Sequence, residues 1–233
     1  MRLDKYISQN TDFSRKDVKR LLRSGAVTVD GETVSDPALH INEDQRVELE
    51  GAPLTGGGPR YFMLNKPEGY VCATKDSEHP TVIDLINEPN SDRLQIAGRL
   101  DIDTTGLVLI TDDGQWNHAV TSPRRGCKKR YYVTTDDDIG PDTIRHFEKG
   151  VYLDSEKRRT LPAELELLYA NEARLTIREG KYHQVKRMFA AMGNRVDSLH
   201  REAVGSIVLD EDLAPGDYRP LTDEEVQSVY NVS

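Results

Sequence analysis

The chain contains few of the residues that mark metalloproteins and disulfide-bonded proteins. Its 233 residues include only two cysteines and six histidines. Cys72 and Cys127 show neither C-x-x-C spacing nor a second pair, so we expect free thiols and no zinc site. The histidines are scattered and show no metal-binding spacing, which disfavours a metal centre. We therefore expect no metal cofactor.

Long hydrophobic runs and phosphate-binding loops are missing as well. No stretch approaches the roughly 18 uncharged residues that cross a membrane, and residues 1–5 lack the apolar segment of a secretory signal. The three glycines at residues 56–58 lack the Lys-Ser/Thr that ends a P-loop, so we expect no nucleotide cofactor. These absences predict a cytoplasmic protein without a membrane partner.

A net positive charge is also absent, because the formal charge is -9. This value argues against a nucleic-acid partner, since cations must meet the phosphates. The distribution of charge is uneven, however. Residues 1–25 carry seven basic and three acidic residues, whereas acidic residues gather at 136–138, 210–212 and 223–225. We expect a polarised molecule whose acidic faces turn away from bound RNA.

Residues 1–50 have the pattern of two short helices followed by a β-hairpin. Apolar residues recur at helical spacing in residues 3–7, and Ser14 begins a capping pattern for a second helix that Gly25 ends. An Asp-Gly turn predicts a hairpin at residues 27–34. Basic residues of the second helix lie away from its apolar side, and we predict that they contact RNA: Arg15, Lys16, Lys19, Arg20 and Arg23. The alternative is a solvated helix face.

A second, larger domain follows a linker. Residues 51–59 have little core-forming content, so we expect an RNA-binding domain at 1–50, a flexible linker at 51–59 and a catalytic domain at 60–233. Strands are predicted at residues 61–66, 69–73, 107–110, 131–135, 163–168 and 173–177, and helices at 143–149 and 185–192. Because strands dominate without regular strand-helix alternation, we expect an α+β fold with a mixed, largely antiparallel sheet.

Residues 98–107, Gly-Arg-Leu-Asp-Ile-Asp-Thr-Thr-Gly-Leu, form the most informative motif. They place Asp101 in a polar turn just before a predicted buried strand. A carboxylate held there can act in catalysis. In the alternative interpretation, Asp101 and Asp103 only close turns by accepting backbone hydrogen bonds.

Three segments together resemble the RsuA-type ribosomal RNA pseudouridine synthases, which isomerise uridine within folded RNA. They are residues 98–107, 129–133 and 179–189, and residues 61–70 resemble the opening motif of the same family. Residues 1–48 resemble the S4 RNA-binding module. The resemblance implies that Asp101 is catalytic, that Tyr131 stacks on the target base and that Lys186 pairs with the catalytic carboxylate.

The chemistry of this family is compatible with those residue types. The bond from C1' to N1 of the nucleotide breaks, the uracil turns, and C1' joins C5, with no redox agent or metal. An ionised Asp101 either attacks C1' or removes the 2' proton, and both routes stay open. A cation such as Lys186 within about 4 to 6 Å favours the ionised carboxylate in a closed pocket.

Three further cations are predicted to contact RNA. Arg99 stands beside the catalytic loop and helps to displace the base, and Lys129 belongs to a basic run, residues 124–130, that leads to Tyr131. Arg187 points away from Lys186 on the presumed helix and meets a phosphate. The alternatives are a solvated loop for the run and an ordinary surface arginine for Arg187.

The resemblance implies a particular substrate, uridine 516 of 16S ribosomal RNA, free or in a small-subunit assembly intermediate. The chain ends without the long basic tail of many large-subunit relatives, which favours the small-subunit target, and one active site per chain makes a monomer sufficient. The alternatives are a large-subunit synthase and a non-catalytic RNA-binding assembly factor. A glycoside hydrolase is disfavoured because no second acidic segment faces Asp101 and Asp103.

Overall fold

A computed structural model describes residues 1–11, 13–42, 44–54, 58–88, 90–122, 126–154 and 156–230. The chain divides into two compact units, Met1–Pro59 and Arg60–Ser233. Part of the predicted linker, residues 124 and 125 of the basic run, and the last three residues lie outside the described residues. Within the described ranges, no helix combines the length and apolar character that a membrane span requires.

The first unit packs two helices against a small antiparallel sheet. Its elements are α1 (Leu3–Gln9), α2 (Arg15–Arg23), β1 (Val27–Val29), β2 (Glu32–Thr33), β3 (Val47–Leu49) and β4 (Ala52–Pro53), with the sheet order β2-β1-β3-β4. The predicted hairpin is confirmed, and Asp30 and Gly31 both have positive φ in its turn. The predicted start of the second helix is also confirmed, because the Ser14 hydroxyl accepts a hydrogen bond from the Asp17 backbone N–H.

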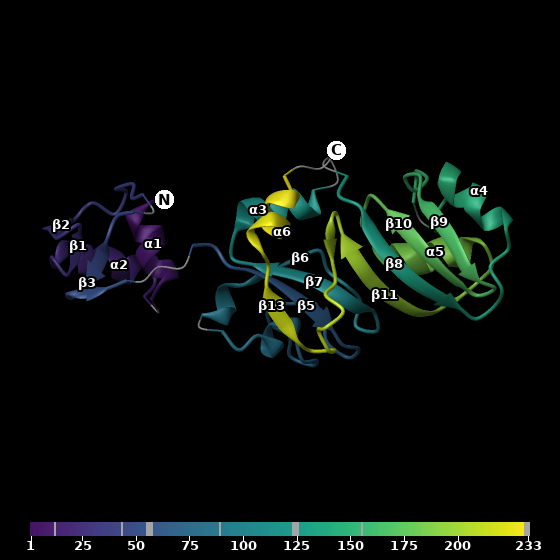
Figure 1. The fold of residues 1–233 in the computed structure, drawn as a ribbon, viewed down its shortest axis with the longest axis horizontal. Coiled ribbons are helices and arrows are strands. Elements are labelled where there is room, and N and C mark those ends of the chain that lie inside the picture. The colour runs from purple at the N-terminus through teal and green to yellow at the C-terminus, as the bar shows by residue number, and fades with distance from the viewer. Residues whose placement is uncertain are drawn as a thin grey trace. The chain divides into compact units, whose positions relative to one another are not determined.

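The second unit is organised around a nine-stranded sheet (Figure 1). Its strands are β5 (Tyr61–Lys66), β6 (Gln95–Ala97), β7 (Thr105–Thr111), β8 (Lys129–Thr135), β9 (Glu164–Tyr169), β10 (Glu172–Ile177), β11 (Val196–Val204), β12 (Ile207–Val208) and β13 (Tyr218–Pro220). The order is β13-β5-β7-β11-β8-β10-β9, with β6 also on β7 and β12 on β11. Among the described strand pairs only β7 and β11 run parallel, so the expected mixed, largely antiparallel sheet is confirmed.

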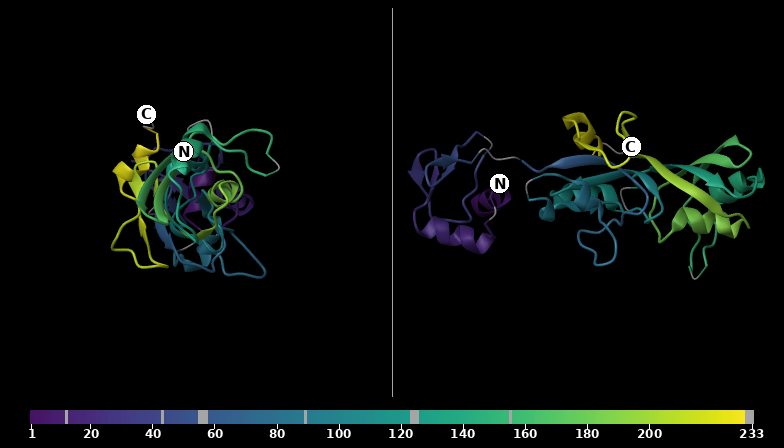
Figure 2. Two further views of the ribbon diagram at one scale, coloured as in Figure 1. Left: turned by 90° about the vertical axis from the view of Figure 1, so that its right-hand side faces the viewer. Right: turned by 90° about the horizontal axis from the view of Figure 1, so that it is seen from below.

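Helices cover both faces of this sheet. They are α3 (Gly114–Thr121), α4 (Asp142–Lys149), α5 (Gln184–Ala191) and α6 (Asp223–Ser228). Strand β7 alternates accordingly: Leu107 and Leu109 pack with α3 and α6, whereas Val108 and Ile110 belong to the core shared with α4 and α5. Figure 1 shows α5 behind β8, β10 and β9, and Figure 2 gives two further views of the same ribbon. Every one of these β7 side chains is fully buried, so the strand is a rigid base for the loop that precedes it.

One sequence prediction needs correction. Residues 69–73 do not form a strand, because Gly69 turns the chain at positive φ and Val71 makes only an isolated bridge to Thr81. Helix α3 was not predicted; Asp113 caps it by accepting hydrogen bonds from the backbone N–H groups of Gln115 and Trp116. The longest strand, β11, was not predicted, because polar residues interrupt its apolar pattern.

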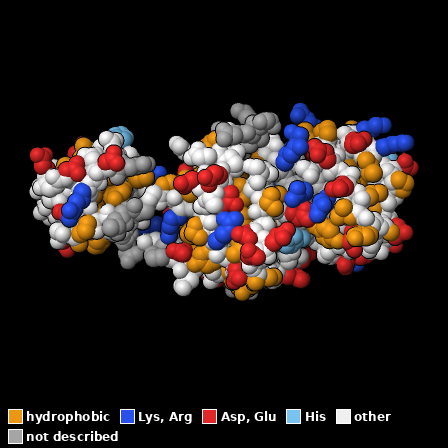
Figure 3. Space-filling view, viewed as in Figure 1, with side chains coloured by type: hydrophobic (Ala, Val, Ile, Leu, Met, Phe, Trp, Pro, Cys, Tyr) orange, Lys and Arg blue, Asp and Glu red, His pale blue; other side chains and the backbone are white. Residues whose placement is uncertain are grey.

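The acidic segments are partly neutralised within the fold. Arg219 lies 2.7 Å from Asp210 and 2.9 Å from Glu225, and Arg195 lies 3.7 Å from Asp136. On the face seen in Figure 3, acidic and basic side chains of the second unit lie side by side. Whether the acidic segments turn away from RNA stays a prediction.

Candidate active site

A pocket opens where two strands share one edge of β7. Strand β6 pairs with the C-terminal part of β7, and β11 pairs with its N-terminal end through Arg201 and Gly106. The loop of residues 98–104 connects β6 to β7 at this junction and lines a cavity of about 940 Å³ together with residues of β8, β11 and α5. This volume lies within the range of ligand pockets.

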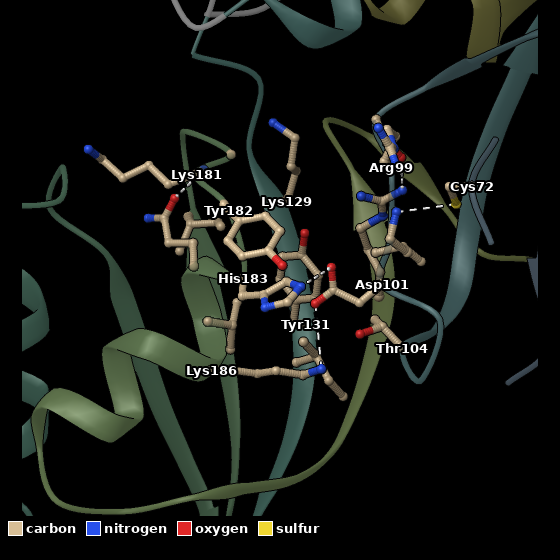
Figure 4. Close-up of a pocket in the computed structure, with 18 of the residues that line it drawn as sticks. Cys72, Arg99, Asp101, Thr104, Lys129, Tyr131, Lys181, Tyr182, His183 and Lys186 are labelled. Atoms are coloured by element: carbon tan, nitrogen blue, oxygen red, sulfur yellow. Dashed lines mark hydrogen bonds and ion pairs between the residues drawn. The ribbon is translucent and has the colours of Figure 1, made fainter. Parts of the chain in front are cut away.

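Asp101 lies in the pocket between two basic side chains of the segment around α5. Its Oδ1 is 3.4 Å from Nε2 of His183, and its Oδ2 is 3.5 Å from Nζ of Lys186 (Figure 4). The Asp101 side chain is 28% exposed, so a substrate can reach it. Sequence reasoning assigned no role to His183, although this residue lies inside one of the motif segments.

Lys186 serves two carboxylates and binds Asp103 more closely than Asp101. Its Nζ donates to both carboxylate oxygens of Asp103, at 2.6 and 2.8 Å. Partial burial alone would raise the pKa of Asp103, but the hydrogen bond and the charge of Lys186 together hold that pKa below its usual value. Lys186 therefore lies within ion-pair distance of Asp101, as predicted, but its shorter contacts are to Asp103.

Tyr131 reaches the same pocket from β8. Alternate residues of this strand are buried, and Tyr131 is 6% exposed with its ring toward the pocket (Figure 4). Tyr132 lies on the opposite face, where its hydroxyl donates to Glu172. The structure thus brings Asp101, Tyr131 and Lys186 together from three separate segments.

Two buried cations that sequence reasoning missed hold the Asp101 loop. Lys66 is fully buried, and its Nζ donates to the backbone oxygens of Pro67, Ile102 and Thr104 at 2.7 to 3.1 Å. Burial lowers the pKa of Lys66, while the charges of Asp103 and Asp101 favour its ammonium form. Lys66 therefore holds the part of the loop that follows Asp101.

Arg201 closes the junction between the strands. Its side chain is almost completely buried, with Nε donating to the backbone oxygen of Leu107 at 2.8 Å and Nη2 to that of Gly98 at 2.7 Å. At Gly106, where φ is +100°, a Cβ atom would collide with the backbone of Arg201. Only glycine permits this close approach, which explains its place in the motif.

The predicted RNA contacts of this unit differ in their surroundings. Arg99 lines the pocket and is exposed. Lys129 also lines it but is buried, with Nζ donating to the backbone oxygen of Cys127 at 3.2 Å; burial lowers its pKa, and the charge of Arg201 adds to this effect. Among the described residues, no carboxylate lies within ion-pair distance of Lys129 or Arg201. These two side chains therefore add basic groups without carboxylate partners to the pocket lining.

Arg187 has partners within the protein. Its guanidinium donates to the backbone oxygens of Tyr182, at 3.0 Å, and Asp154, and it lies 3.7 Å from Glu156. An RNA contact by Arg187 stays a prediction and would have to compete with these bonds.

The predicted RNA-binding residues of the first unit share one property, exposure on α2. They are Arg15, Lys16, Lys19, Arg20 and Arg23. Val18 and Leu22 of the same helix are buried in the core. In the described part of the chain, Arg20 is the only one of the five with a carboxylate in ion-pair distance, Asp17 at 3.5 Å. The other four cations are open to an anionic partner.

Comparison with known proteins agrees with this architecture. Residues 60–191 match the RNA pseudouridylate synthase family, and residues 1–47 match the S4 domain. The chain belongs to the RNA pseudouridylate synthase family.

Relatives cover nearly the whole chain. It is 57% identical to ribosomal small subunit pseudouridine synthase A of Yersinia pestis over 98% of both chains. It is 56% identical to the protein of the same name from Escherichia coli strain K12, over 98% of this chain and all of that one. A crystal structure of a pseudouridylate synthase superposes with a TM-score of 0.72 at 44% identity, covering 98% of this chain and 99% of the other.

Proposed function

We propose that this protein converts a uridine of 16S ribosomal RNA, uridine 516, to pseudouridine, with Asp101 acting on the ribose. Its relatives at 56–57% identity are named for the ribosomal small subunit. The single observation that carries the proposal is the position of Asp101 in a pocket of about 940 Å³, 3.5 Å from Lys186 and beside Tyr131.

The substrate uridine must leave the RNA stack before it reaches this pocket. In a helix, C1' and C5 are shielded by stacking and pairing, so the enzyme has to hold the extruded nucleotide against an aromatic or apolar wall. Tyr131 is suited to form that wall because its ring is fixed within β8. In our proposal its hydroxyl also relays the C5 proton in the last step.

Basic side chains surround the reacting carboxylate in the pocket. Asp101 and Asp103 both lie within ion-pair distance of Lys186, and the buried Lys129 and Arg201 add positive potential without carboxylate partners of their own in the described ranges. A preorganised site of this kind stabilises a charged group without reorganisation during the reaction. The ionised Asp101 then attacks C1' or removes the 2' proton.

Binding of the RNA is divided between the two units. The exposed cations of α2 supply phosphate contacts in the S4 domain. Arg99, Lys129 and Arg187 supply contacts around the pocket, with Arg99 entering the space that the base leaves. We further propose that the protein works as a monomer in the cytoplasm, on free ribosomal RNA or on a small-subunit assembly intermediate.

The test maps pseudouridine in small-subunit and large-subunit RNA incubated with the purified protein, read by carbodiimide-dependent primer stops. We expect one stop, at uridine 516, and none with Asp101→Asn. A stop only in large-subunit RNA would overturn the assigned target. No stop in either RNA, despite tight binding, would favour a non-catalytic assembly factor.

A further inference from the structure

Tyr182 and His183 form a stacked pair at the mouth of the pocket. Their ring centroids are 3.7 Å apart, and the planes are inclined by 22°. Both residues line the cavity, and His183 also contacts Asp101. Figure 4 shows the Tyr182 ring above His183, in front of the deeper Tyr131. The pair therefore connects the protein surface to the catalytic carboxylate.

Tyr182 differs from the pocket's other aromatic residue in its exposure. Tyr131 is 6% exposed, as expected of a residue packed in a strand, whereas Tyr182 is 76% exposed. Packing against His183 occupies only part of the Tyr182 ring, and the remaining surface faces solvent. A large ring left this open gains little for the fold, because hydrophobic stabilisation scales with the area that is buried.

The turn that presents Tyr182 is held rigidly. His183 has φ of +45°, a left-handed conformation that is uncommon outside glycine and occurs often at functional sites. The Gln184 side chain accepts from the Lys181 backbone N–H at 2.9 Å, and Arg187 donates to the Tyr182 backbone oxygen at 3.0 Å. Lys181 is further fixed by Glu156 at 2.9 Å. The ring is thus preorganised for a partner.

We propose that Tyr182 is a stacking platform for an unpaired base of the substrate RNA next to the extruded uridine. The inference rests on the proposed function, since it assumes that the target nucleotide occupies the space between Asp101 and Tyr131. Bases of single-stranded RNA stack on exposed aromatic side chains, and this contact tolerates any base. A base on Tyr182 orders His183 and, through it, the carboxylate of Asp101.

The experiment is a double-mutant cycle between protein and RNA, with dissociation constants as the readout. The full chain and Tyr182→Ala bind a small-subunit RNA fragment that is intact or abasic on the 5' or 3' side of the target uridine. We expect Tyr182→Ala to weaken binding of intact RNA by about 5- to 150-fold. An abasic site on one side should weaken wild-type binding by a similar factor, and there the variant should bind no more weakly than the wild type.

Matched variants separate stacking from damage to the fold. Tyr182→Phe keeps the ring and should bind within about threefold of the wild type, because the stacking surface is retained. Tyr169→Ala removes another exposed tyrosine, 71% exposed and outside the pocket lining, and should bind like the wild type. Thermal melting of Tyr182→Ala checks that it is folded.

The inference is overturned if Tyr182→Ala binds intact RNA as well as the wild type, or if its affinity falls by the same factor on intact and both abasic RNAs. Failure of the proposed function is recognised separately, in the wild-type protein, by the absence of pseudouridine in the intact fragment. If the wild type forms pseudouridine but the effects of Tyr182→Ala and of the abasic sites are independent, the stacking role of Tyr182 is refuted and the proposed function is not.

Discussion

The two units use their basic side chains in opposite ways. In the second unit, Lys66 and Arg201 behind the Asp101 loop and Lys186 in the pocket each donate hydrogen bonds to protein oxygen atoms at 2.6 to 3.1 Å. On α2, five basic side chains are exposed, and one of them has a carboxylate in ion-pair distance among the described residues. The first set of side chains holds neighbouring groups in place. The second set carries positive charge that is exposed to solvent and its ions.

Because of this difference, we expect the two sets of side chains to affect different quantities, the reaction rate and the affinity for RNA. A reacting carboxylate needs a fixed geometry, because small displacements of catalytic groups cost large factors in rate. Binding of a polyanion needs only positive charge near the phosphates, and it weakens with salt. Changes of Lys66, Lys186 or Arg201 should therefore alter the rate or the stability, whereas changes on α2 should alter the dissociation constant and its salt dependence.

Among changes of the basic side chains, the largest effect is expected from Lys186→Met. This change removes the only lysine or arginine within ion-pair distance of Asp101 and Asp103 in the described residues. We expect the single-turnover rate of pseudouridine formation at saturating RNA to fall by about 100-fold or more, the size of effect that loss of one preorganised electrostatic partner has at an active site. Lys149→Met, an exposed change in α4, is the control. A Lys186→Met variant with the full rate would show that the reaction does not need the positive charge of Lys186 beside Asp101.

Lys66→Met tests the supporting role of a buried cation. The backbone oxygen of Thr104 would lose a buried donor, and those of Pro67 and Ile102 would each lose a partly buried one. A buried oxygen left unsatisfied costs about 1–3 kcal/mol. With partial relaxation, we expect the free energy of unfolding to fall by about 2–4 kcal/mol, measured by denaturant titration. If stability is unchanged, Lys66 does not hold the loop.

Charge reversal on α2 tests the other side of the comparison. With Lys19, Arg20 and Arg23 changed to Glu, the dissociation constant for RNA should rise. The slope of log affinity against log salt should become shallower by about 0.7 to 0.9 for each phosphate that the helix no longer neutralises. The rate at saturating RNA should fall far less than in Lys186→Met. An unchanged slope would show that α2 does not meet phosphates.

The smallest effect concerns the Asp103–Lys186 pair and pH. The pKa of Asp103 is lowered in the folded protein, so the pair stabilises the fold above the unfolded pKa, about 3.9, and this contribution disappears as pH falls through the folded value. Because the Asp103 side chain is 54% exposed, Asp103→Asn should cost less than about 1 kcal/mol at pH 7. Thermal melts of both proteins should converge in acid, and a difference that grows as pH falls would contradict the assignment.

The sequence predicted those turns and helix ends whose conformation depends on a few adjacent residues. The Asp30-Gly31 turn and the Ser14 cap were predictable because a few adjacent residues fix each of them. The approach of Asp101, Tyr131 and Lys186 followed from a family resemblance and not from periodicity, since these residues come from three distant segments.

The supports of the site could not be predicted in this way. Lys66 and Arg201 bind backbone oxygens that lie far away in the sequence, and no side-chain motif announces such partners. The sequence around Arg187 is that of an exposed helix position. In the structure its guanidinium nevertheless donates hydrogen bonds to two backbone oxygens, those of Tyr182 and Asp154. Tertiary packing also determines the conformation of residues 69–73. They have the residue pattern of a strand, but only Val71 makes a β-bridge, to Thr81.

The most direct test of the central claim compares two carboxylates that share one lysine. We predict that Asp101→Asn forms no detectable pseudouridine in a single-turnover assay while binding RNA as the wild type does. Asp103→Asn should stay within about tenfold of the wild-type rate, since a change of that size is about 1.4 kcal/mol in the barrier. An active Asp101→Asn variant beside an inactive Asp103→Asn variant would contradict the account.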